Sequence, residues 1–286
     1  MHPVTSPSRR ALAVGALAAA LVAAPALPVA AAPDLPTYLC SDLMRENPEG
    51  TVWDVMVRGH VIADAGCSVL YSNVVGDLTV LPDGDLDMHR SGVHGELAVA
   101  GPAYVRESEV HGDVSVATSG TVAPAIAYSW VGGSVRGTAD ELTLGAVTVT
   151  GDVDVDTTRT LRLWDVLVGG SLDATGGRLI AHRTTVTGNL TSTGATDVLV
   201  CRGVVGGDLT VAGVQGWSRV GEERRLRCHS SVAGSVRVVD NPHTVVLGDL
   251  AVAGDLVCTG NTGPRGVVLR DRLAVAGTRS GQCARP

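Results

Sequence analysis

A short phrase of alternating apolar and polar positions recurs along the chain. It reads VHGELAV from Val93 and VHGDVSV from Val110. Related copies stand as VVGDLTV at 74, VGGSVRG at 131, VTGDVDV at 149, VGGSLDA at 168, VTGNLTS at 186, VGGDLTV at 205, VAGSVRV at 232, VLGDLAV at 246 and a degraded LRDRLAV at 269. Val, Gly, Leu or Val and a final small residue occupy every second position, which predicts a strand with one buried face.

The spacing of the copies predicts how these strands are assembled. Successive copies lie mostly 17 to 21 residues apart, and apolar residues also recur near six-residue intervals, as at Val93, Val99 and Val105. Each coil then consists of three short straight segments, called flats below, that are joined by tight bends. Such coils form an all-β, single parallel β-helix of about eleven coils. An antiparallel sandwich is the competing fold, but its strands do not repeat one phrase in fixed phase. The crossover rule favours right-handed winding, although left-handed solenoids also show six-residue spacing, so handedness stays open.

The glycine of each phrase and the residue after it suggest a special corner. The glycine indicates either an unusual φ or an approach too close for a Cβ. The outward column after it comprises Asp77, Glu96, Asp113, Ser134, Asp152, Ser171, Asn189, Asp208, Ser235 and Asp249. Stacked carboxylates repel, so calcium could bridge them. Alternatively, these side chains cap backbone N–H groups at a bend.

A candidate metal site lies in the two copies that carry histidine. His94 and His111 fall in one outward column of adjacent coils, beside Glu96 and Asp113. Imidazole and carboxylate groups at this spacing could hold a divalent metal. They could equally be surface residues that were duplicated with their repeat.

One coil is longer than the others, and functional residues on solenoids usually lie in such insertions. The step from Val205 to Val232 is 27 residues, with the extra stretch expected at 212–231. It carries Trp217, Glu222, Arg224 and Arg225, which are residue types suited to a sugar-binding or partner-binding loop. The alternative is a solvated charged loop.

The N-terminus has the features of an export signal. Arg9 and Arg10 precede an apolar stretch that contains no charge before Asp34, and small residues near Ala31 suit cleavage. We therefore expect a signal peptide at 1–31 and a secreted, extracellular or envelope-associated mature protein without a transmembrane domain. An uncleaved anchor is the alternative. Both the Sec and the twin-arginine routes remain open.

Six cysteines in an exported chain imply disulfides. Of the many possible connectivities, we expect the sequential one, because each pair lies within or between neighbouring repeats: Cys40 with Cys67, Cys201 with Cys228, and Cys258 with Cys283. The first and last pairs would close the two ends of the solenoid. The expected organisation is an N-terminal cap at 32–67, a β-helix at 68–258, and a last coil with a C-terminal cap at 259–286. Closed ends favour a monomer.

The amino-acid composition and the repeat pattern limit the classes of partner and activity that we expect. All 22 basic residues are arginine, and without Arg9 and Arg10 the remaining 20 face 29 acidic residues. This balance argues against nucleic acid as a partner. β-Helix polysaccharide lyases and hydrolases need a groove with facing acids and a positioned base. Here the coils are minimal and the acids form an extended column, so no catalytic residue and no resident cofactor is assigned.

The terminal cysteine motifs carry a family resemblance. The segment from Cys67 to Val80, CSVLYSNVVGDLTV, the phrase LVCTGN ending at Asn261, and GQC ending at Cys283 resemble a group of secreted bacterial β-helix repeat proteins of unsettled function. In that group a cysteine opens the first coil, and Leu-x-Cys with Gly-Gln-Cys closes the last. The resemblance implies the fold, export and the Cys258–Cys283 pairing. The coil length is also similar to that of the bactofilins, which supports shape alone.

Three hypotheses for function follow from these features. The leading one is a secreted, non-catalytic β-solenoid scaffold for envelope-associated or extracellular binding or adhesion, with cell-wall or extracellular polysaccharide as the candidate partner. The second is a carbohydrate-active β-helix enzyme, either a polysaccharide lyase or a hydrolase. The third is a surface protein that binds calcium or another divalent metal.

Overall fold

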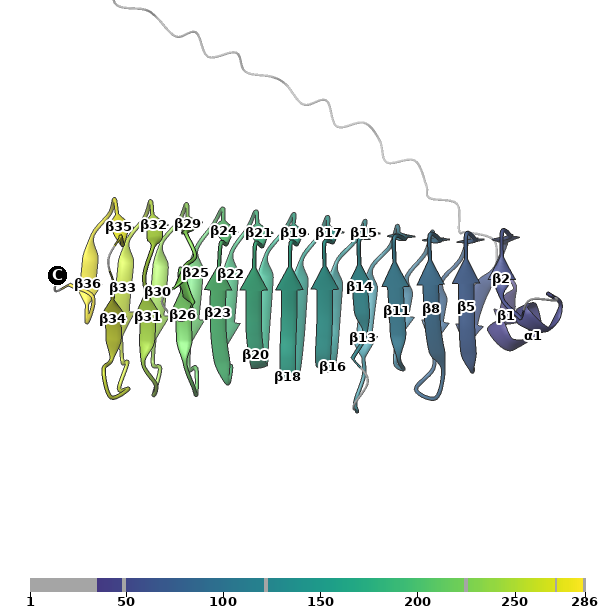
Figure 1. Cartoon of the computed structure of the whole chain (residues 1–286), viewed down its shortest axis with the longest axis horizontal. Helices are drawn as coiled ribbons and strands as arrows, with labels where there is room; N and C mark the ends of the chain where they lie inside the picture. Colours follow the sequence, from purple (N-terminus) through teal and green to yellow (C-terminus); the bar gives the residue numbers. More distant parts are fainter. Residues whose placement is uncertain (1–34, 48–49, 121–122, 224–225, 271, 285–286) are drawn as a thin grey trace, which may run out of the picture. The chain divides into compact units, whose positions relative to one another are not determined.

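The computed structural model describes residues 35–47, 50–120, 123–223, 226–270 and 272–284. The expected signal peptide at 1–31 lies outside the described residues. The chain from Leu35 onward forms one compact unit, a parallel β-solenoid whose only described helix is the six-residue α1 (Cys40–Arg45) (Figure 1). The all-β, single-solenoid prediction is confirmed, whereas the winding direction stays a prediction.

Each coil has two longer flats and one short flat. Flat 1 contains β1 (Thr37–Leu39), β4 (His60–Ala63), β7 (Leu78–Val80), β10 (Leu97–Val99), β13 (Val114–Ala117), β22 (Leu190–Thr193), β25 (Leu209–Ala212), β30 (Val236–Val239), β33 (Leu256–Thr259) and β36 (Arg279–Gly281). Flat 2 contains β2 (Val52–Trp53), β5 (Gly66–Leu70), β8 (Asp85–His89), β11 (Ala103–Arg106), β14 (Ala125–Ala127), β23 (Asp197–Cys201), β26 (Ser218–Val220), β31 (Val245–Leu247) and β34 (Val267–Leu269). In the middle coils, β16 (Val135–Gly145), β18 (Val153–Trp164) and β20 (Leu172–His182) run through both flats.

The short flat is a separate sheet of two- and three-residue strands. Its members are β3 (Met56–Val57), β6 (Asn73–Val74), β9 (Gly92–Val93), β12 (Glu109–Val110), β15 (Trp130–Val131), β17 (Thr148–Val149), β19 (Leu167–Val168), β21 (Thr185–Val186), β24 (Val204–Val205), β29 (Ser230–Val232), β32 (Leu250–Val252) and β35 (Ala274–Val275). Twelve such strands are described, which is close to the eleven coils expected.

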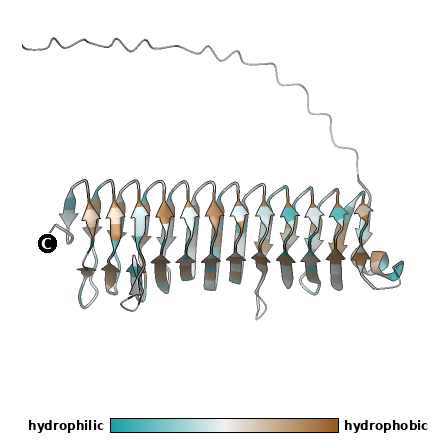
Figure 2. Cartoon of the chain, turned by 45° about the horizontal axis from the view of Figure 1, so that its top comes forward, coloured by the Kyte–Doolittle hydropathy of each residue, from teal (hydrophilic) through white to brown (hydrophobic). Residues whose placement is uncertain are grey.

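The core consists of columns of identical repeat positions. Each strand pairs in parallel with its equivalent one coil along, so Leu97 lies opposite both Leu78 and Val114. Leu78 and Leu97 are fully buried and Val114 is nearly so, and burying such a side chain contributes about 1.5–3 kcal/mol. Hydrophobic colouring accordingly appears on the strands along the whole length of the rod (Figure 2).

The repeated glycine is required by close approach and not by its φ. The Gly95 N–H donates to the Gly76 carbonyl at 3.1 Å, and a Cβ on Gly95 would lie 2.8 Å from that oxygen. Gly112 makes the same contact with Gly95. None of these glycines has a positive φ. We call this turn, between the short flat and flat 1, the glycine corner. The sequence allowed either an unusual φ or a close backbone approach for its glycine, and the close approach is correct.

Positive φ occurs instead at the turn from flat 2 to the next short flat, in residues that are not glycine. Examples are Tyr71 (52°), Arg90 (48°), Tyr128 (51°), Ala146 (52°) and Asp165 (57°). The left-handed conformation costs an L-residue about 1–2 kcal/mol. We call this turn the aromatic corner. It comprises positions 53–54, 70–71, 89–90, 106–107, 127–128, 145–146, 164–165 and 182–183.

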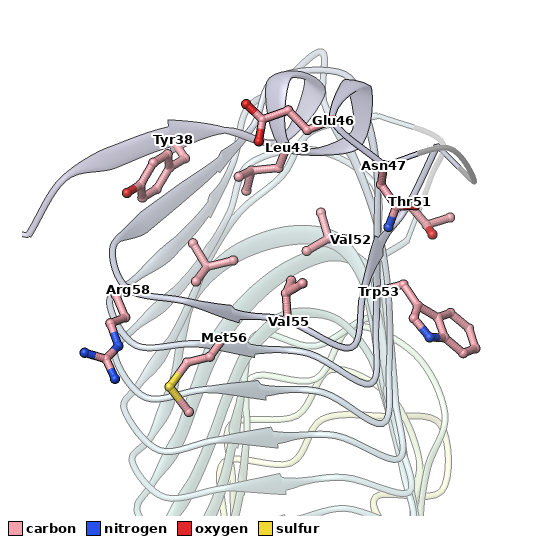
Figure 3. A pocket seen from close by; sticks show the side chains of 11 residues that line it. Tyr38, Leu43, Glu46, Asn47, Thr51, Val52, Trp53, Val55, Met56 and Arg58 are labelled. Carbon is pink, nitrogen blue, oxygen red and sulfur yellow. The ribbon is translucent and has the colours of Figure 1, made fainter.

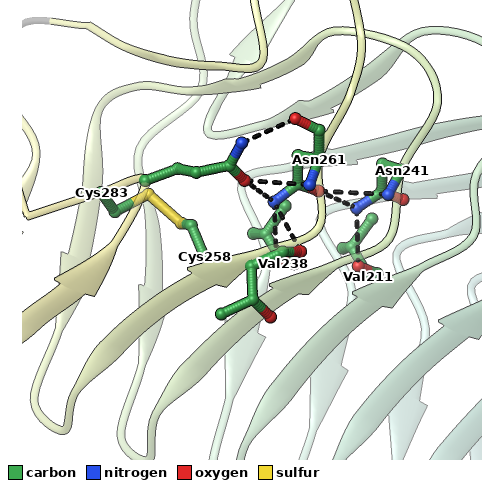
Figure 4. Close-up of a disulfide and its surroundings, with 8 residues drawn as sticks. Val211, Val238, Asn241, Cys258, Asn261 and Cys283 are labelled. Carbon is green, nitrogen blue, oxygen red and sulfur yellow. Dashed lines mark hydrogen bonds between the residues drawn. A yellow bond between two sulfur atoms is a disulfide. The ribbon is translucent and has the colours of Figure 1, made fainter.

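Buried polar side chains at the aromatic corner and at the turn from flat 1 to flat 2 are satisfied between coils. The Ser72 N–H donates to Ser91 Oγ, and the Ser91 N–H donates to Ser108 Oγ, each at 3.1 Å. Near the C-terminal end, Asn241 Nδ2 donates to Asn261 Oδ1 at 2.7 Å, and Asn261 Nδ2 donates to Gln282 Oε1 at 2.8 Å (Figure 4). Buried amides need such partners, which explains the glutamine before the last cysteine.

All three expected disulfides are present, with Cα–Cα distances of 5.7, 4.8 and 5.4 Å in chain order. Cys40 on α1 joins the buried Cys67 on β5 at one end. Cys283, after β36, joins Cys258 on β33 at the other end (Figure 4). All four cysteines are buried, so the two bonds fasten the terminal segments to the core at its two ends.

Coil pairing starts earlier than the sequence suggested. Strand β1 pairs with β4, and β2 pairs with β5, so regular coils already occupy most of the expected cap at 32–67. The structural cap is α1, inserted between the two strands of the first coil. Asp64 accepts hydrogen bonds from the Ser41 N–H at 3.1 Å and from Ser41 Oγ at 2.7 Å, which fixes the helix on the end of the solenoid.

Candidate functional site

The outward column at the glycine corner is a ladder of hydrogen bonds between coils. Asp113 Oδ1 accepts from the Ser134 N–H at 2.7 Å, and Ser134 Oγ accepts from the Asp152 N–H at 3.1 Å. Asp152 continues the pattern to Ser171 at 2.8 Å. These side chains therefore cap N–H groups on the next coil. This agrees with the capping alternative, except that the partner is one coil away and not local.

The column differs from the expected one at its C-terminal end. Asp249 has a φ of 41° and directly precedes β32 of the short flat, so it is not in the column. Asp255 takes that place, and its Oδ1 accepts from the Thr278 N–H at 2.8 Å. These contacts with Thr278 lower the pKa of Asp255. The sequence misassigned the phase because VLGDLAV at 246 imitates the repeat while the copy in phase is VAGDLVC, which ends at Cys258.

His94 and His111 are side by side, but as a stack. Their ring centroids are 4.7 Å apart and their planes differ by 9°. The edge of His111 also meets the ring of Trp130, with centroids 5.3 Å apart. A metal lies in the plane of each coordinating imidazole at about 2.0–2.1 Å from its nitrogen. Two parallel rings share no such plane, so this arrangement does not chelate without rotation of one ring.

The neighbouring carboxylates do not complete a metal site. Glu96 Oε1 accepts from Ser115 Oγ, and Asp113 is occupied in the ladder. In the part of the chain that the structure describes, no group of three or more His, Cys, Asp or Glu side chains could hold a metal. Metal binding by His94, His111, Glu96 and Asp113 stays a prediction, and it would require rearrangement of these side chains.

The overlong coil contains less extra chain than expected. Residues 218–220 form β26, which pairs with β23 and β31 as an ordinary strand of flat 2. The insertion is a two-stranded antiparallel hairpin, β27 (Glu222–Glu223) and β28 (Leu226–Arg227), followed by Cys228. Trp217 therefore directly precedes a regular strand of flat 2 and is not on the inserted hairpin. Arg224 and Arg225 lie outside the described residues.

Trp217 and Glu222 line a pocket on flat 2 near the C-terminal end. Its volume is about 280 Å³, and its described lining is Trp217, Arg219, Glu222, Thr244, Val246, Arg265, Val268 and Arg270. The indole of Trp217 is half exposed, and the guanidinium of Arg219 lies 5.4 Å from a ring centroid. Arg270 Nε lies 3.7 Å from Glu222 Oε2. Three arginines, one carboxylate and an exposed aromatic ring therefore line the same pocket.

A second pocket lies at the N-terminal end, beside α1 (Figure 3). It has a volume of about 570 Å³. Trp53, Val55 and Met56 contribute its exposed apolar surface. It forms where the first coil has no earlier strand to cover flat 2 and the short flat. Its described polar lining, which includes Glu46, Asn47 and Arg58, is spread around the rim.

The aromatic corner gathers rings and charges that sequence reasoning missed. Near the N-terminal end, Trp53 packs on Tyr71 with centroids 4.9 Å apart. Arg90 Nη1 donates to Tyr71 Oη at 3.1 Å, and Arg90 Nε donates to Glu107 Oε2 at 2.7 Å. The hydrogen bond from Arg90 lowers the pKa of Glu107. These residues directly precede the buried serines in the sequence. The alternation of aromatic and charged residues at these positions was the signal from which the corner could have been predicted.

The same corner continues in the middle coils. Trp164 stacks on His182 with centroids 4.3 Å apart and planes 16° apart. The guanidinium of Arg183 lies 4.7 Å from a ring centroid of Trp164, and its Nη2 donates to Asp165 Oδ2 at 2.6 Å. The hydrogen bond from Arg183 lowers the pKa of Asp165.

Comparisons with known proteins add no assignment, since no family model, curated protein or solved structure matches the chain. Among the described residues, no helix is long and apolar enough to cross a membrane.

Proposed function

We propose that the protein is an exported, non-catalytic β-solenoid scaffold that binds acidic cell-wall or extracellular polysaccharide through the Trp217 pocket. The observation that carries this proposal is the exposed indole of Trp217 beside Arg219, Arg265 and Arg270. Aromatic faces pack against the apolar C–H faces of sugars. Guanidinium groups bind carboxylates in bidentate fashion. The pocket thus suits a sugar that carries an acid group.

The disulfides support export. All six cysteines are paired in three bonds, and no described cysteine is free, as is usual in oxidising compartments. Together with the expected signal peptide and the resemblance to secreted bacterial repeat proteins, this supports a cell-surface or extracellular location. The disulfides that fasten both terminal segments support a monomer.

The pocket supports binding more than catalysis. Glycoside hydrolysis generally uses two carboxyl groups across the scissile bond. Among the described residues that line the Trp217 pocket, Glu222 is the only carboxylate, and it is paired with Arg270. A β-helix lyase or hydrolase is therefore the weaker alternative. Calcium bridging is weaker too, because the column carboxylates accept backbone N–H groups.

Native gels that contain an acidic polysaccharide test this proposal. We expect a polyuronate such as alginate to retard the wild-type protein and to retard Trp217→Ala much less. Tyr104→Ala is the matched control, because Tyr104 is similarly exposed on flat 2 but lies in β11, far along the chain from the pocket. Unsaturated or reducing products released from the polyuronate would overturn the scaffold proposal in favour of the enzyme. Equal retardation of the wild type and Trp217→Ala would overturn the proposed pocket.

A further inference from the structure

A notch one coil wide separates two exposed aromatic residues on the aromatic corner. Ala127, which precedes Tyr128, lies opposite Gly145, and Gly145 lies opposite Trp164. Tyr128 and Trp164 therefore belong to the coils on either side of Gly145. Two coil steps correspond to about 9.6 Å along the rod. The coil between them carries only Gly145 and Ala146 at this corner.

The space above Gly145 is open. A Cβ built on Gly145 would meet no heavy atom within 4 Å. Tyr128 and Trp164 remain 65% and 45% exposed, although each is large enough to cover its neighbours. The corner is thus open at Gly145, between two coils that each carry an exposed aromatic side chain.

The outer sides of both rings are supported by the adjoining coils. Arg106, on the coil before Tyr128, places its guanidinium 5.8 Å from the tyrosine centroid. His182 and Arg183, on the coil after Trp164, pack against the indole at 4.3 Å and 4.7 Å. Because these supporting groups come from outside the notch, the rings are held in place without filling it.

Neither burial nor backbone preference explains Tyr128. Its φ of 51° is in the left-handed region, where a bulky side chain is costly and glycine is favoured. The ring is nevertheless mostly exposed. The same left-handed φ recurs at Arg90, Ala146 and Asp165, so it belongs to the corner, and the exposed ring is what distinguishes Tyr128.

The guanidinium groups beside the notch are paired with carboxylates. Arg106 Nε lies 3.4 Å from Glu107 Oε1, and Arg183 is hydrogen-bonded to Asp165. Arg106 shares Glu107 with Arg90, whose Nε donates to Glu107 Oε2 at 2.7 Å, so each guanidinium close to the rings has a carboxylate beside it. An uncharged ligand with many hydroxyl groups suits such a rim. Each hydroxyl group can accept a hydrogen bond from a guanidinium and donate one to a carboxylate. In this respect the notch differs from the arginine-rich Trp217 pocket.

We infer that the Tyr128–Trp164 notch binds one neutral pyranose ring of a polysaccharide, sandwiched between the phenol and the indole. The plane of the Trp164 indole lies across the rod and not along it, because His182 stacks on its face from the next coil. A sugar ring between the aromatics would lie parallel to that plane, so the glycan chain would cross the corner. The inference builds on the proposed glycan-binding function but shares no residue with the Trp217 pocket, so the two can fail separately.

Filling the notch tests this inference without removing either ring. Gly145→Val is expected to fold, because Gly145 lies on a strand, has no positive φ and has free space at its Cβ. Gly66→Val is the matched control, since Gly66 also lies on a flat 2 strand with nothing within 4 Å of its Cβ. Thermal melts should show the folding transition of the wild type in both variants. Trp164→Ala provides a second variant that opens the site instead of blocking it.

The probes are native gels that contain a neutral β-glucan or galactomannan. We expect at least one of them to retard the wild type and Gly66→Val, and affinity to fall about tenfold or more in Gly145→Val and Trp164→Ala. Trp217→Ala should bind the neutral polymer as the wild type does, even if it no longer binds alginate. Absence of retardation by both neutral polymers would overturn the inference, and so would wild-type binding by Gly145→Val.

Discussion

The carboxylate of Asp113 accepts a hydrogen bond from the backbone N–H of Ser134, one coil further along the solenoid, at 2.7 Å. The same relationship joins Asn189 to Asp208 and Asp208 to Ser235. The polar column that resembles a row of cation ligands in the sequence thus acts as a row of acceptors that connect successive coils.

Removing an acceptor from this ladder should destabilise the fold without any role for a metal. We expect Asp113→Leu to lower the free energy of unfolding by about 1–2 kcal/mol, because the Ser134 N–H loses its partner. Asp113→Asn keeps an acceptor and should cost less. Asp154→Leu, at an exposed position on β18 two coils further along, is the control. Urea denaturation measures the differences. A loss in Asp113→Asn as large as in Asp113→Leu would mean that the negative charge itself is needed.

The stacked histidines predict that metal has little effect on stability. Since the parallel rings of His94 and His111 cannot share one in-plane ion, neither EDTA nor added Zn²⁺ should shift the melting temperature. His94→Phe should keep the stack and most of the stability. The contrary result is a rise in melting temperature with Zn²⁺ that disappears in His94→Phe, which would restore the metal hypothesis for His94, His111, Glu96 and Asp113.

Acid should loosen the N-terminal cap first. The hydrogen bond from Ser41 Oγ holds the pKa of Asp64 below its ordinary value, so the folded state binds fewer protons than the unfolded state in mildly acidic solution. The resulting stability is present at neutral pH and is lost as the pH falls below about 4. Hydrogen exchange of the α1 amides, followed from pH 7 into that range, should reveal the opening. Ser41→Ala should weaken this pH dependence, and an unchanged profile in that variant would refute the assignment.

Strain at the aromatic corner predicts an opposite response to glycine at two nearby alanines. Ala146 has a φ of 52°, so Ala146→Gly should raise the free energy of unfolding by about 0.5–1 kcal/mol. Ala127 lies on β14 without positive φ, so Ala127→Gly should lower it by a similar amount. Differential scanning calorimetry compares the two. Destabilisation by both substitutions would show that the corner is not strained at Ala146.

The architecture could be predicted because the repeat encodes it directly. A period of two with a fixed phase places Leu78, Leu97 and Val114 in one buried column, whatever the remaining sequence is. Cysteine spacing within neighbouring repeats likewise located the disulfides. Prediction failed where a pseudo-repeat at Val246 matched the phrase in the wrong phase, since composition alone cannot distinguish two corners of the same coil.

The sites were harder to predict because they depend on neighbours one coil away. Trp217 was identified by its type, but Arg265 and Arg270 reach its pocket from later coils. The Tyr128–Trp164 notch arises from the small size of Gly145, which in the sequence resembles any other strand-end glycine. The register at each corner determines which outward side chains contact one another across coils. This register becomes known only when the coils are assembled.

The most direct test of the account is isothermal titration of an oligouronate into the wild type, Trp217→Ala, Arg270→Gln and Tyr104→Ala at low and high salt. We predict binding by the wild type and Tyr104→Ala that weakens as salt rises, and a loss of about tenfold or more in Trp217→Ala and Arg270→Gln. Absence of binding by the wild type at low salt, or equal affinity in all four proteins, would contradict the Trp217 pocket as an acidic-glycan site.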